Sequence, residues 1–271
     1  MNGTDNNIIR LPFKDYILYT VSDRRTIILL VIGLVGLALY ACHSIFFSVD
    51  DYHTFSPYPT IFLQELLGTS NPFAFFCSVY YTFLFAINLA LVIVSAYVVP
   101  YFGKKKVAPW AYIVGIFLVW FVDMILYVIY PVAPPIRYNS GACRIRQKYL
   151  PWSEVLIRVK YNALPSGHIM YLTCGFYIAR YEKVKKLEMW YLINIILTSF
   201  IVIYLGEHYI IDIVSGFIIT IIIMDMFIRY ANKIGFSRME LPNVEKEEEI
   251  VMRSAPPSTH DQGLIRENIP V

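Results

Sequence analysis

Charged residues are scarce in this chain. Asp, Glu, Lys and Arg together make up 16% of its 271 residues, whereas a soluble domain carries about a quarter. Hydrophobic residues reach 57%, which argues against a soluble globular class. The formal net charge of +3 is too small to indicate a nucleic-acid partner. The composition therefore predicts an integral membrane protein before any motif is read.

Metal-binding and nucleotide-binding patterns are also missing. None of the four cysteines has Cys-x-x-Cys spacing, and Cys42, Cys77 and Cys174 lie in apolar stretches, where structural cysteines are expected. The sequence has no nucleotide-binding loop and no internal repeat. A cleavable signal is not expected either, because no small-residue cleavage site ends the first apolar stretch. We expect no cofactor, no structural metal and no nucleic-acid partner.

Long apolar runs are what the sequence has instead. A helix that crosses a bilayer needs about 20 apolar residues, and six stretches qualify, although the fourth is short: Thr26–Phe47, Phe73–Val99, Pro109–Tyr130, His168–Tyr181, Met189–Leu205 and His208–Arg229. We therefore predict an all-α, polytopic six-helix transmembrane bundle, in a multi-pass protein of the plasma membrane.

The chain divides into three predicted parts. Residues 1–24 form a cytoplasmic segment, in which Ile8–Thr20 has the spacing of an interfacial helix. Residues 25–231 form the six-span catalytic membrane domain. Residues 232–271 are rich in charge and proline and poor in aromatics, so they are predicted to be a disordered cytoplasmic tail.

The basic residues predict the orientation. Lysine and arginine gather before the first span and after the second, fourth and sixth, whereas Ser48–Asn71 has none. Both termini are therefore predicted to be cytoplasmic. One predicted outer loop, Val132–Leu164, breaks the rule because it is rich in basic residues. The span count is in error, or the other loops override the orientation of this loop. Alternatively, its cations bind an anion on the outer face. We favour the anion; the loop's cations are Arg137, Arg144, Arg146, Lys148, Arg158 and Lys160.

The first chemical motif is Pro165-Ser166-Gly167-His168. Proline suits a first helical turn because its missing N–H would have no partner there. Serine and glycine leave backbone N–H groups approachable, and a helix start of this kind binds a phosphate oxyanion by geometry and by its dipole. A helix cap with an interfacial histidine is the plain alternative.

The second motif is His208-Tyr209-Ile210-Ile211-Asp212. Residues four apart on a helix share a face, so Asp212 is predicted to bond one ring nitrogen of His208 and leave the other free. A buried structural pair is the alternative. The predicted topology puts His168 and His208 at the same outer face, and this favours a joint functional site. Asp123, inside the third span, requires a polar partner or a cavity.

These motifs resemble the type 2 phosphatidic acid phosphatase superfamily, which includes lipid phosphate phosphatases, polyprenyl diphosphate phosphatases and, more distantly, vanadium haloperoxidases. Tyr130–Arg137 and the second motif are similar to the branch that contains inositol phosphorylceramide synthases. The resemblance covers about Tyr130–Gly216. It implies that His208 is a nucleophile forming a phosphohistidine, that Asp212 orients it, and that His168 protonates the departing oxygen. It further implies a phosphate held by Arg137, Ser166 and Gly167.

Two cations of the family's motifs are absent. Tyr130 occupies the lysine position of the first motif, and Tyr138 follows Arg137 in place of proline. Ile201 and Val202 stand where the third motif normally opens with Ser-Arg. These departures fit the transferase-like branch better, and the replacement cations are open among Arg144, Arg146, Lys148, Arg158 and Lys160.

The leading prediction is a membrane enzyme that cleaves or transfers a phosphoryl group of a lipid phosphate or diphosphate at its outer face. An inositol phosphorylceramide synthase-like transferase is the closest alternative. A transporter that uses His168, His208 and Asp212 as an ion relay is the second, and a metal site built from the same three residues is weaker. The lipid, the acceptor and the oligomeric state are open.

Overall fold

A computed structural model of the chain describes residues 12–29, 31–32, 35, 52–137, 140–153 and 163–237. These residues are mostly helical and include no strand beyond one isolated bridge between His53 and Val132. The predicted all-α class is confirmed in this sense. Most of the first predicted span, Thr26–Phe47, lies outside the described residues, as does most of the predicted tail.

Several described helices are long and apolar enough to cross a membrane. Three pass individually: α6 (Pro109–Ile129), α10 (Lys185–Tyr204) and α11 (Ile210–Lys233). A fourth span is formed if the bent pair Pro72–Phe83 and Ile87–Phe102 is counted as one. This pair comprises α4 (Pro72–Val79), the π-helical η1 (Tyr80–Leu84) and α5 (Phe85–Phe102). The described part thus supports a membrane protein with three or four spans, and the count of six stays a prediction.

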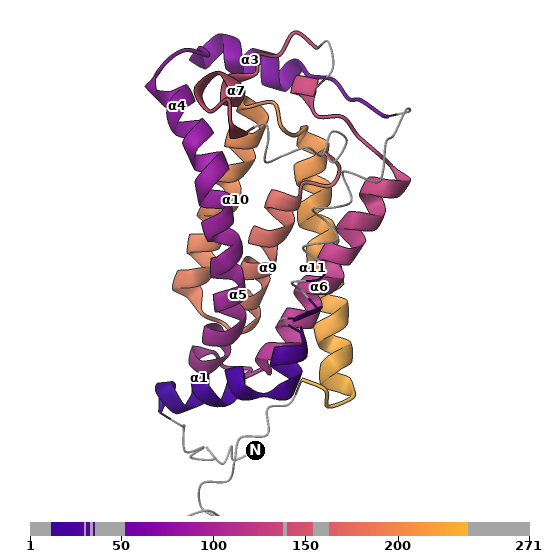
Figure 1. Ribbon diagram of the computed structural model, residues 1–271. Helices are drawn as coiled ribbons and strands as arrows, with labels where there is room; N and C mark the ends of the chain where they lie inside the picture. Colours follow the sequence, from indigo (N-terminus) through magenta and orange to yellow (C-terminus); the bar gives the residue numbers. More distant parts are fainter. Residues whose placement is uncertain are drawn as a thin grey trace, which may run out of the picture. The chain divides into compact units, whose positions relative to one another are not determined.

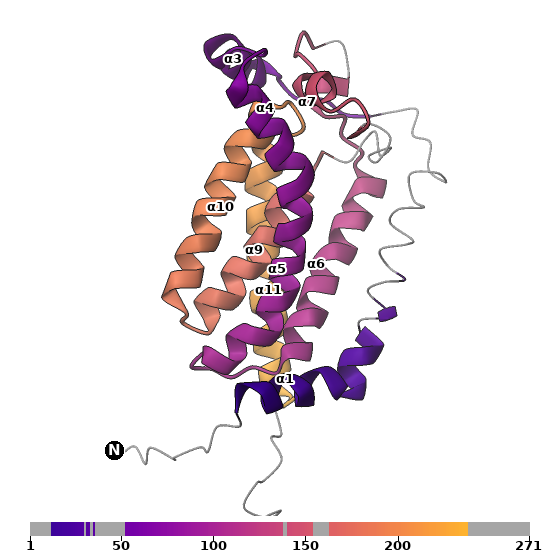
Figure 2. The ribbon, with the colours of Figure 1, turned by 60° about the vertical axis from the view of Figure 1, so that its left-hand side comes forward.

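Helix α9 (Gly167–Tyr181) is the central element. It packs against α5, α6, α10 and α11, and both ribbon views place it inside the bundle (Figures 1 and 2). Its 15 residues extend about 22 Å, less than the roughly 30 Å of a bilayer core. Most of its side chains are buried by protein, so α9 positions groups inside the bundle and its length need not match the bilayer.

The two ends of the bundle carry different short helices (Figure 1). α1 (Phe13–Ser22) lies across one end, where the Tyr16 hydroxyl donates to the Tyr97 carbonyl at 3.1 Å. α3 (Tyr58–Leu67) and α7 (Ile145–Tyr149) cover the other end. Residues 234–237 continue from α11 and remain folded, because the Trp110 indole donates to the Phe236 carbonyl at 3.0 Å. Most of the predicted tail, residues 232–271, lies outside the described residues, and the tail stays a prediction.

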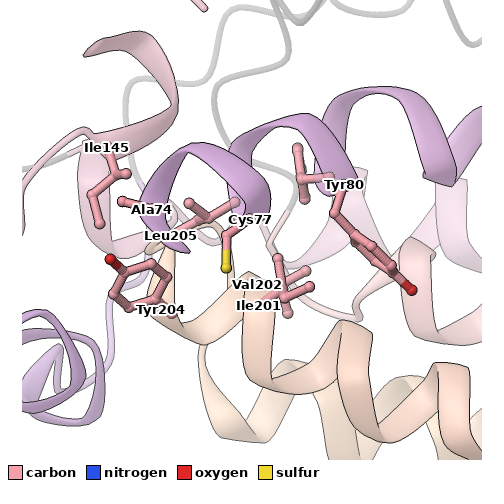
Figure 3. Packing of buried hydrophobic residues seen from close by; sticks show 9 residues of the cluster. Ala74, Cys77, Tyr80, Ile145, Ile201, Val202, Tyr204 and Leu205 are labelled. Atoms are coloured by element: carbon pink, nitrogen blue, oxygen red, sulfur yellow. The ribbon is translucent and has the colours of Figure 1, made fainter. Parts of the chain in front are cut away.

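A hydrophobic cluster fixes α7 at its end of the bundle. Side chains of α4, α7 and α10 meet there, and Figure 3 shows Ile145 of α7 beside residues of the other two helices. Burial of each large apolar side chain contributes about 2 kcal/mol, so the short α7 is held by packing and not by its own length. The buried members are Ala74, Cys77, Tyr80, Tyr81, Ile145, Ile201, Val202, Tyr204 and Leu205.

Candidate active site

A glycine-centred turn carries the chain from α10 to His208. Gly206 has a φ of 75°, its N–H donates to the Ile203 carbonyl at 3.0 Å, and the Glu207 N–H donates to the Val202 carbonyl at 2.9 Å. This pair of bonds is the Schellman ending of a helix, which favours glycine because other residues are strained at such a φ. The turn stops α10 and points Glu207 and His208 back toward the bundle.

The ring of His208 is held by a backbone carbonyl. Its Nδ1 lies 2.9 Å from the Ala163 oxygen, and a carbonyl can only accept, so Nδ1 carries the proton and donates. Ala163 is fixed in turn, because its N–H donates to the Val132 carbonyl at 3.0 Å, and Val132 bridges to His53. In a neutral ring held this way, the second nitrogen, Nε2, keeps its lone pair.

The two predicted histidines lie together. His168 Nδ1 is 3.2 Å from His208 Nε2, and the rings meet edge to face with centroids 5.3 Å apart. When the His208 ring is neutral, with its proton on Nδ1, Nε2 accepts in this contact and His168 Nδ1 donates. His208 is buried, so in this form a nitrogen lone pair lies opposite an N–H donor, away from bulk water.

Asp212 lies beside His208 in a different way from the prediction. α11 begins at Ile210, so His208 precedes the helix, and the spacing of four residues is not yet helical. Asp212 Oδ2 accepts the Tyr209 N–H at 2.7 Å and is 3.5 Å from His208 Nδ1. The carboxylate caps the helix start and remains close enough to favour a positive charge on the ring.

Ser166 and Gly167 join the two motifs. The Ser166 N–H donates to the Asp212 carbonyl at 2.9 Å, which ties the start of α9 to the first turn of α11. The buried Ser166 hydroxyl has no hydrogen-bond partner among the described residues. At Gly167, an added Cβ would lie 3.3 Å from Asp123 Oδ2. Asp123 therefore lies beside the N-terminal end of α9, and the Tyr127 hydroxyl is the polar partner that it requires.

Arg137 ends the 3₁₀ turn η2 (Pro135–Arg137), next to the turn that carries His208. The Ile136 N–H donates to the Gly206 carbonyl at 3.1 Å. Arg137 thus directly follows the residue that is hydrogen-bonded to this turn, and its side chain is half-buried. All six predicted site residues therefore belong to segments that hydrogen bonds connect at one end of α9.

Sequence reasoning did not single out a buried ion pair beside these residues. Arg146 Nε lies 2.8 Å from Glu207 Oε1, and both side chains are almost fully buried. The Arg146 guanidinium sits over the ring of Tyr81 at 5.0 Å, and the same ring lies 4.6 Å from that of His168. The loop's excess of cations was the only signal in the sequence, and it did not identify Arg146.

The segments that carry these residues lie within a match to a known family. The family model described as PAP2 superfamily matches residues 54–226, more than half of the chain. The chain belongs to the PAP2 superfamily. Comparison with curated proteins and with solved structures gave no match. The matched range of this PAP2 protein includes every predicted site residue as well as Arg146 and Glu207.

Membership fixes the broad class of chemistry. The PAP2 superfamily is a family of phosphatase-type enzymes, so phosphate esters are the substrate class. Within the described residues, no group of three or more His, Cys, Asp or Glu side chains is arranged to hold a metal ion. The side chains gathered here, two imidazoles, carboxylates and guanidinium groups, are chemically suited to bind a phosphate and to exchange protons.

Proposed function

We propose that this PAP2 protein is a multi-pass membrane enzyme that removes or transfers the phosphoryl group of a lipid phosphate or diphosphate through a phosphohistidine on His208. The supporting observation is the direct opposition of His208 Nε2 and His168 Nδ1 at 3.2 Å. The Ala163 carbonyl orients the His208 ring through its other nitrogen, Nδ1, at 2.9 Å. A neutral imidazole fixed in this tautomer is a competent nucleophile.

In the first step, His208 Nε2 attacks the phosphorus atom and the bond from phosphorus to the lipid oxygen breaks. His168 enters the step as an imidazolium, a form that the bound phosphate anion favours. It gives its Nδ1 proton to that oxygen and becomes a neutral imidazole, and the oxygen leaves as the lipid alcohol or, from a diphosphate, as the lipid monophosphate. General acid assistance of this kind contributes about 10²–10⁴-fold. Substrate phosphate must enter between the two rings, so their contact describes the resting state.

In the second step, water attacks the phosphohistidine. His168, now without its proton, accepts one from the water, the bond between phosphorus and Nε2 breaks, and inorganic phosphate leaves. Both histidines return to their starting forms. Asp212, 3.5 Å from Nδ1, stabilises the positive ring that exists while the nitrogen is phosphorylated.

The phosphate oxygens are held at the start of α9. The Ser166 hydroxyl lies there without a partner in the described structure, and the Gly167 N–H belongs to the first helical turn, whose dipole favours an anion. Arg137 supplies a guanidinium fork from η2. These three assignments follow the family resemblance and the proximity of their segments.

The proposed setting is a bundle of six spans with both termini in the cytoplasm. α1 and the end of α11 lie at one end of the bundle (Figure 1), as two cytoplasmic segments would. His168 lies in the first turn of α9 and His208 just before α11, toward the end of the bundle that α3 and α7 cover. We propose that this end faces the outside of the plasma membrane. The lipid's tail then lies between helices and its phosphate reaches the histidines.

The test is phosphate release by the purified full chain from phosphatidic acid, lysophosphatidic acid and a polyprenyl diphosphate, with ³²P trapping of the intermediate. We expect label that is stable in base, lost in acid, and absent in His208→Ala. His168→Ala should lower turnover about 10²-fold or more. His53→Ala is the matched control, because this exposed ring stacks on Tyr130 with centroids 4.1 Å apart. Near-normal turnover in His208→Ala would sink the proposal.

An acceptor alcohol other than water is the second candidate. The Tyr130–Arg137 segment, which resembles the inositol phosphorylceramide synthase branch, favours it. Adding inositol to the labelled reaction separates the two outcomes: a transferase moves ³²P to the alcohol, whereas a phosphatase releases it as phosphate. Proton uptake into proteoliposomes, lost in His208→Ala and without any phosphate chemistry, would instead indicate an ion relay.

A further inference from the structure

Arg146 is the most deeply buried cation in the described structure. Its side chain is 0% exposed, although an arginine cannot lose its charge in a protein. Its neighbour Ile145 is locked into the cluster of Figure 3, and the Leu150 N–H donates to the Arg146 carbonyl at 2.7 Å. The backbone that carries the guanidinium is therefore held firmly in place.

The guanidinium has fewer partners than its burial requires. Its Nε forms an ion pair with Glu207 Oε1 at 2.8 Å, and the Tyr81 ring covers one face at 5.0 Å. Nη1 and Nη2, which carry four of the five N–H groups, have no hydrogen-bond partner among the described residues. A buried charge with unfilled donors is costly, so these donors are well suited to an anionic ligand.

Arg146 is one side chain removed from the histidine pair. Arg146 and His168 both contact the Tyr81 ring: the guanidinium carbon lies 5.0 Å from the ring centroid, and the centroid of the His168 ring lies 4.6 Å from it. Glu207, which pairs with Arg146, is the residue directly before His208. The same two histidine rings are in contact with each other. Arg146 is therefore linked to His168 through Tyr81 and to His208 through Glu207.

We propose that Arg146 binds the phosphoryl group of the substrate through Nη1 and Nη2, while Glu207 holds Nε and so aims the fork. A planar guanidinium matches two phosphoryl oxygens and offsets the charge that grows on them during transfer. This inference rests on the proposed function and identifies the cation that binds the substrate phosphate there. Ile145 packs in the same cluster as Val202, so Arg146 enters close to the position where the third motif lacks its arginine.

The probe for this proposal is orthovanadate, an inorganic mimic of the phosphoryl group, titrated against the purified full chain. Its affinity is read from the rise in melting temperature and from inhibition of phosphate release. We expect Arg146→Gln to weaken vanadate binding about 100-fold and Arg146→Lys, which keeps the charge without the fork, about 10-fold. Arg144→Gln is the matched control, because Arg144 Nε already donates to the Ile136 carbonyl at 3.1 Å; its affinity should change less than about 3-fold.

Loss of Arg146 leaves Glu207 buried without its cation, and Arg146→Gln alone can fail to fold for that reason. The double variant Arg146→Gln/Glu207→Gln removes both charges and keeps polar side chains, and its melting temperature without vanadate reports its folding. We expect this variant to fold and to lose the vanadate response. Affinity within about 3-fold of the parent, in the double variant and in Arg146→Lys, would overturn the proposal.

The two proposals fail in different ways. A parent chain that binds vanadate through Arg146 but forms no phosphohistidine contradicts the proposed function and leaves the anion site standing. A parent chain that turns over, with vanadate affinity unaffected by the Arg146 variants, contradicts only this inference. Absence of any vanadate response in the parent chain also counts against Arg146.

Discussion

The two ends of α9 hold buried polar clusters that differ in one respect. At the C-terminal end of α9, the Glu182 carboxylate accepts four hydrogen bonds of 2.8–2.9 Å. Their donors are the backbone N–H groups of residues 105–107 and the Tyr112 hydroxyl. The carboxylate is fully buried, and both of its oxygens are occupied. This network binds the lysine-rich turn to the bundle.

At the start of α9, several buried atoms have no partner in the part of the chain that the structure describes. They belong to a hydroxyl, two carboxyl groups and a guanidinium: Ser166 Oγ, Asp123 Oδ1, Asp212 Oδ1, and Nη1 and Nη2 of Arg146. Folded proteins pair almost all such groups. One cluster is complete without a ligand, whereas the other has donors and acceptors in excess.

The difference separates a structural role from a binding role. A satisfied buried network stabilises the fold, and an incomplete one lowers stability unless water or a ligand completes it. Tyr16 lies near the C-terminal end of α9. Burial raises the pKa of its hydroxyl above the ordinary value, and the negative charge of Glu182 adds a smaller increase. Tyr16 therefore stays protonated and keeps donating to the Tyr97 carbonyl. Substitutions at the two ends should separate stability from activity.

The largest loss of stability is expected from Glu182→Ala. Three backbone N–H groups and one hydroxyl lose their acceptor in a buried place, at about 1–3 kcal/mol each when unsatisfied, so we expect unfolding to become easier by about 4 kcal/mol. Activity per folded molecule should change less than about 2-fold, since the histidines lie a whole helix away. Thermal unfolding and phosphate release, normalised to the folded fraction, measure both. A large drop in specific activity would mean that the two ends are coupled.

The next largest effect is expected from Gly206→Ala. The new Cβ would lie 2.5 Å from Ile136 Cγ2 at a φ of 75°, so we expect a loss of about 2 kcal/mol and a fall in turnover of about 10-fold or more as His208 moves. Gly235→Ala is the matched control, because Gly235 has the same φ of 75° with nothing within 4 Å. It should lose about 1 kcal/mol and keep its turnover. Equal effects on turnover would refute a positioning role for the turn.

The sequence predicted the apolar helices well and the site only in part. The expected span Pro109–Tyr130 differs from α6 by a single residue, because length and apolar composition decide such a helix. The Ala163 carbonyl, 45 residues from His208, has no signal in the sequence. Arg146 was one of several loop cations, and its burial depends on packing of α7 against the distant α4. Long-range packing carries information that local pattern does not.

A matched pair of tyrosines on α6 sharpens the comparison. The Tyr112 hydroxyl donates to Glu182 Oε1 at 2.9 Å, and the Tyr127 hydroxyl donates to the Pro165 carbonyl at 3.1 Å. We expect Tyr112→Phe to lower stability by about 1.5 kcal/mol, because the lost hydrogen bond is to a carboxylate, and to leave turnover unchanged. Tyr127→Phe should cost about 1 kcal/mol and also reduce turnover several-fold, since Pro165 leads into the His168 turn. Thermal unfolding and initial rates test both variants. Unchanged turnover in Tyr127→Phe would contradict the assignment of a binding role to the N-terminal end of α9.

The smallest effect on stability is expected from Ser166→Ala. The hydroxyl is buried without a partner, so its removal should leave the free energy of unfolding unchanged or raise it by up to about 1 kcal/mol. If this hydroxyl holds a phosphate oxygen, the KM for the lipid phosphate should rise about 5- to 10-fold. Thr173→Val is the control on the same helix, because the buried Thr173 hydroxyl donates to the Ile169 carbonyl at 2.7 Å; it should lose about 1 kcal/mol and keep its KM. A buried group whose removal spares the fold and weakens the substrate is one that the fold retains for its ligand, and a serine whose loss destabilises the chain while KM stays constant would be structural instead.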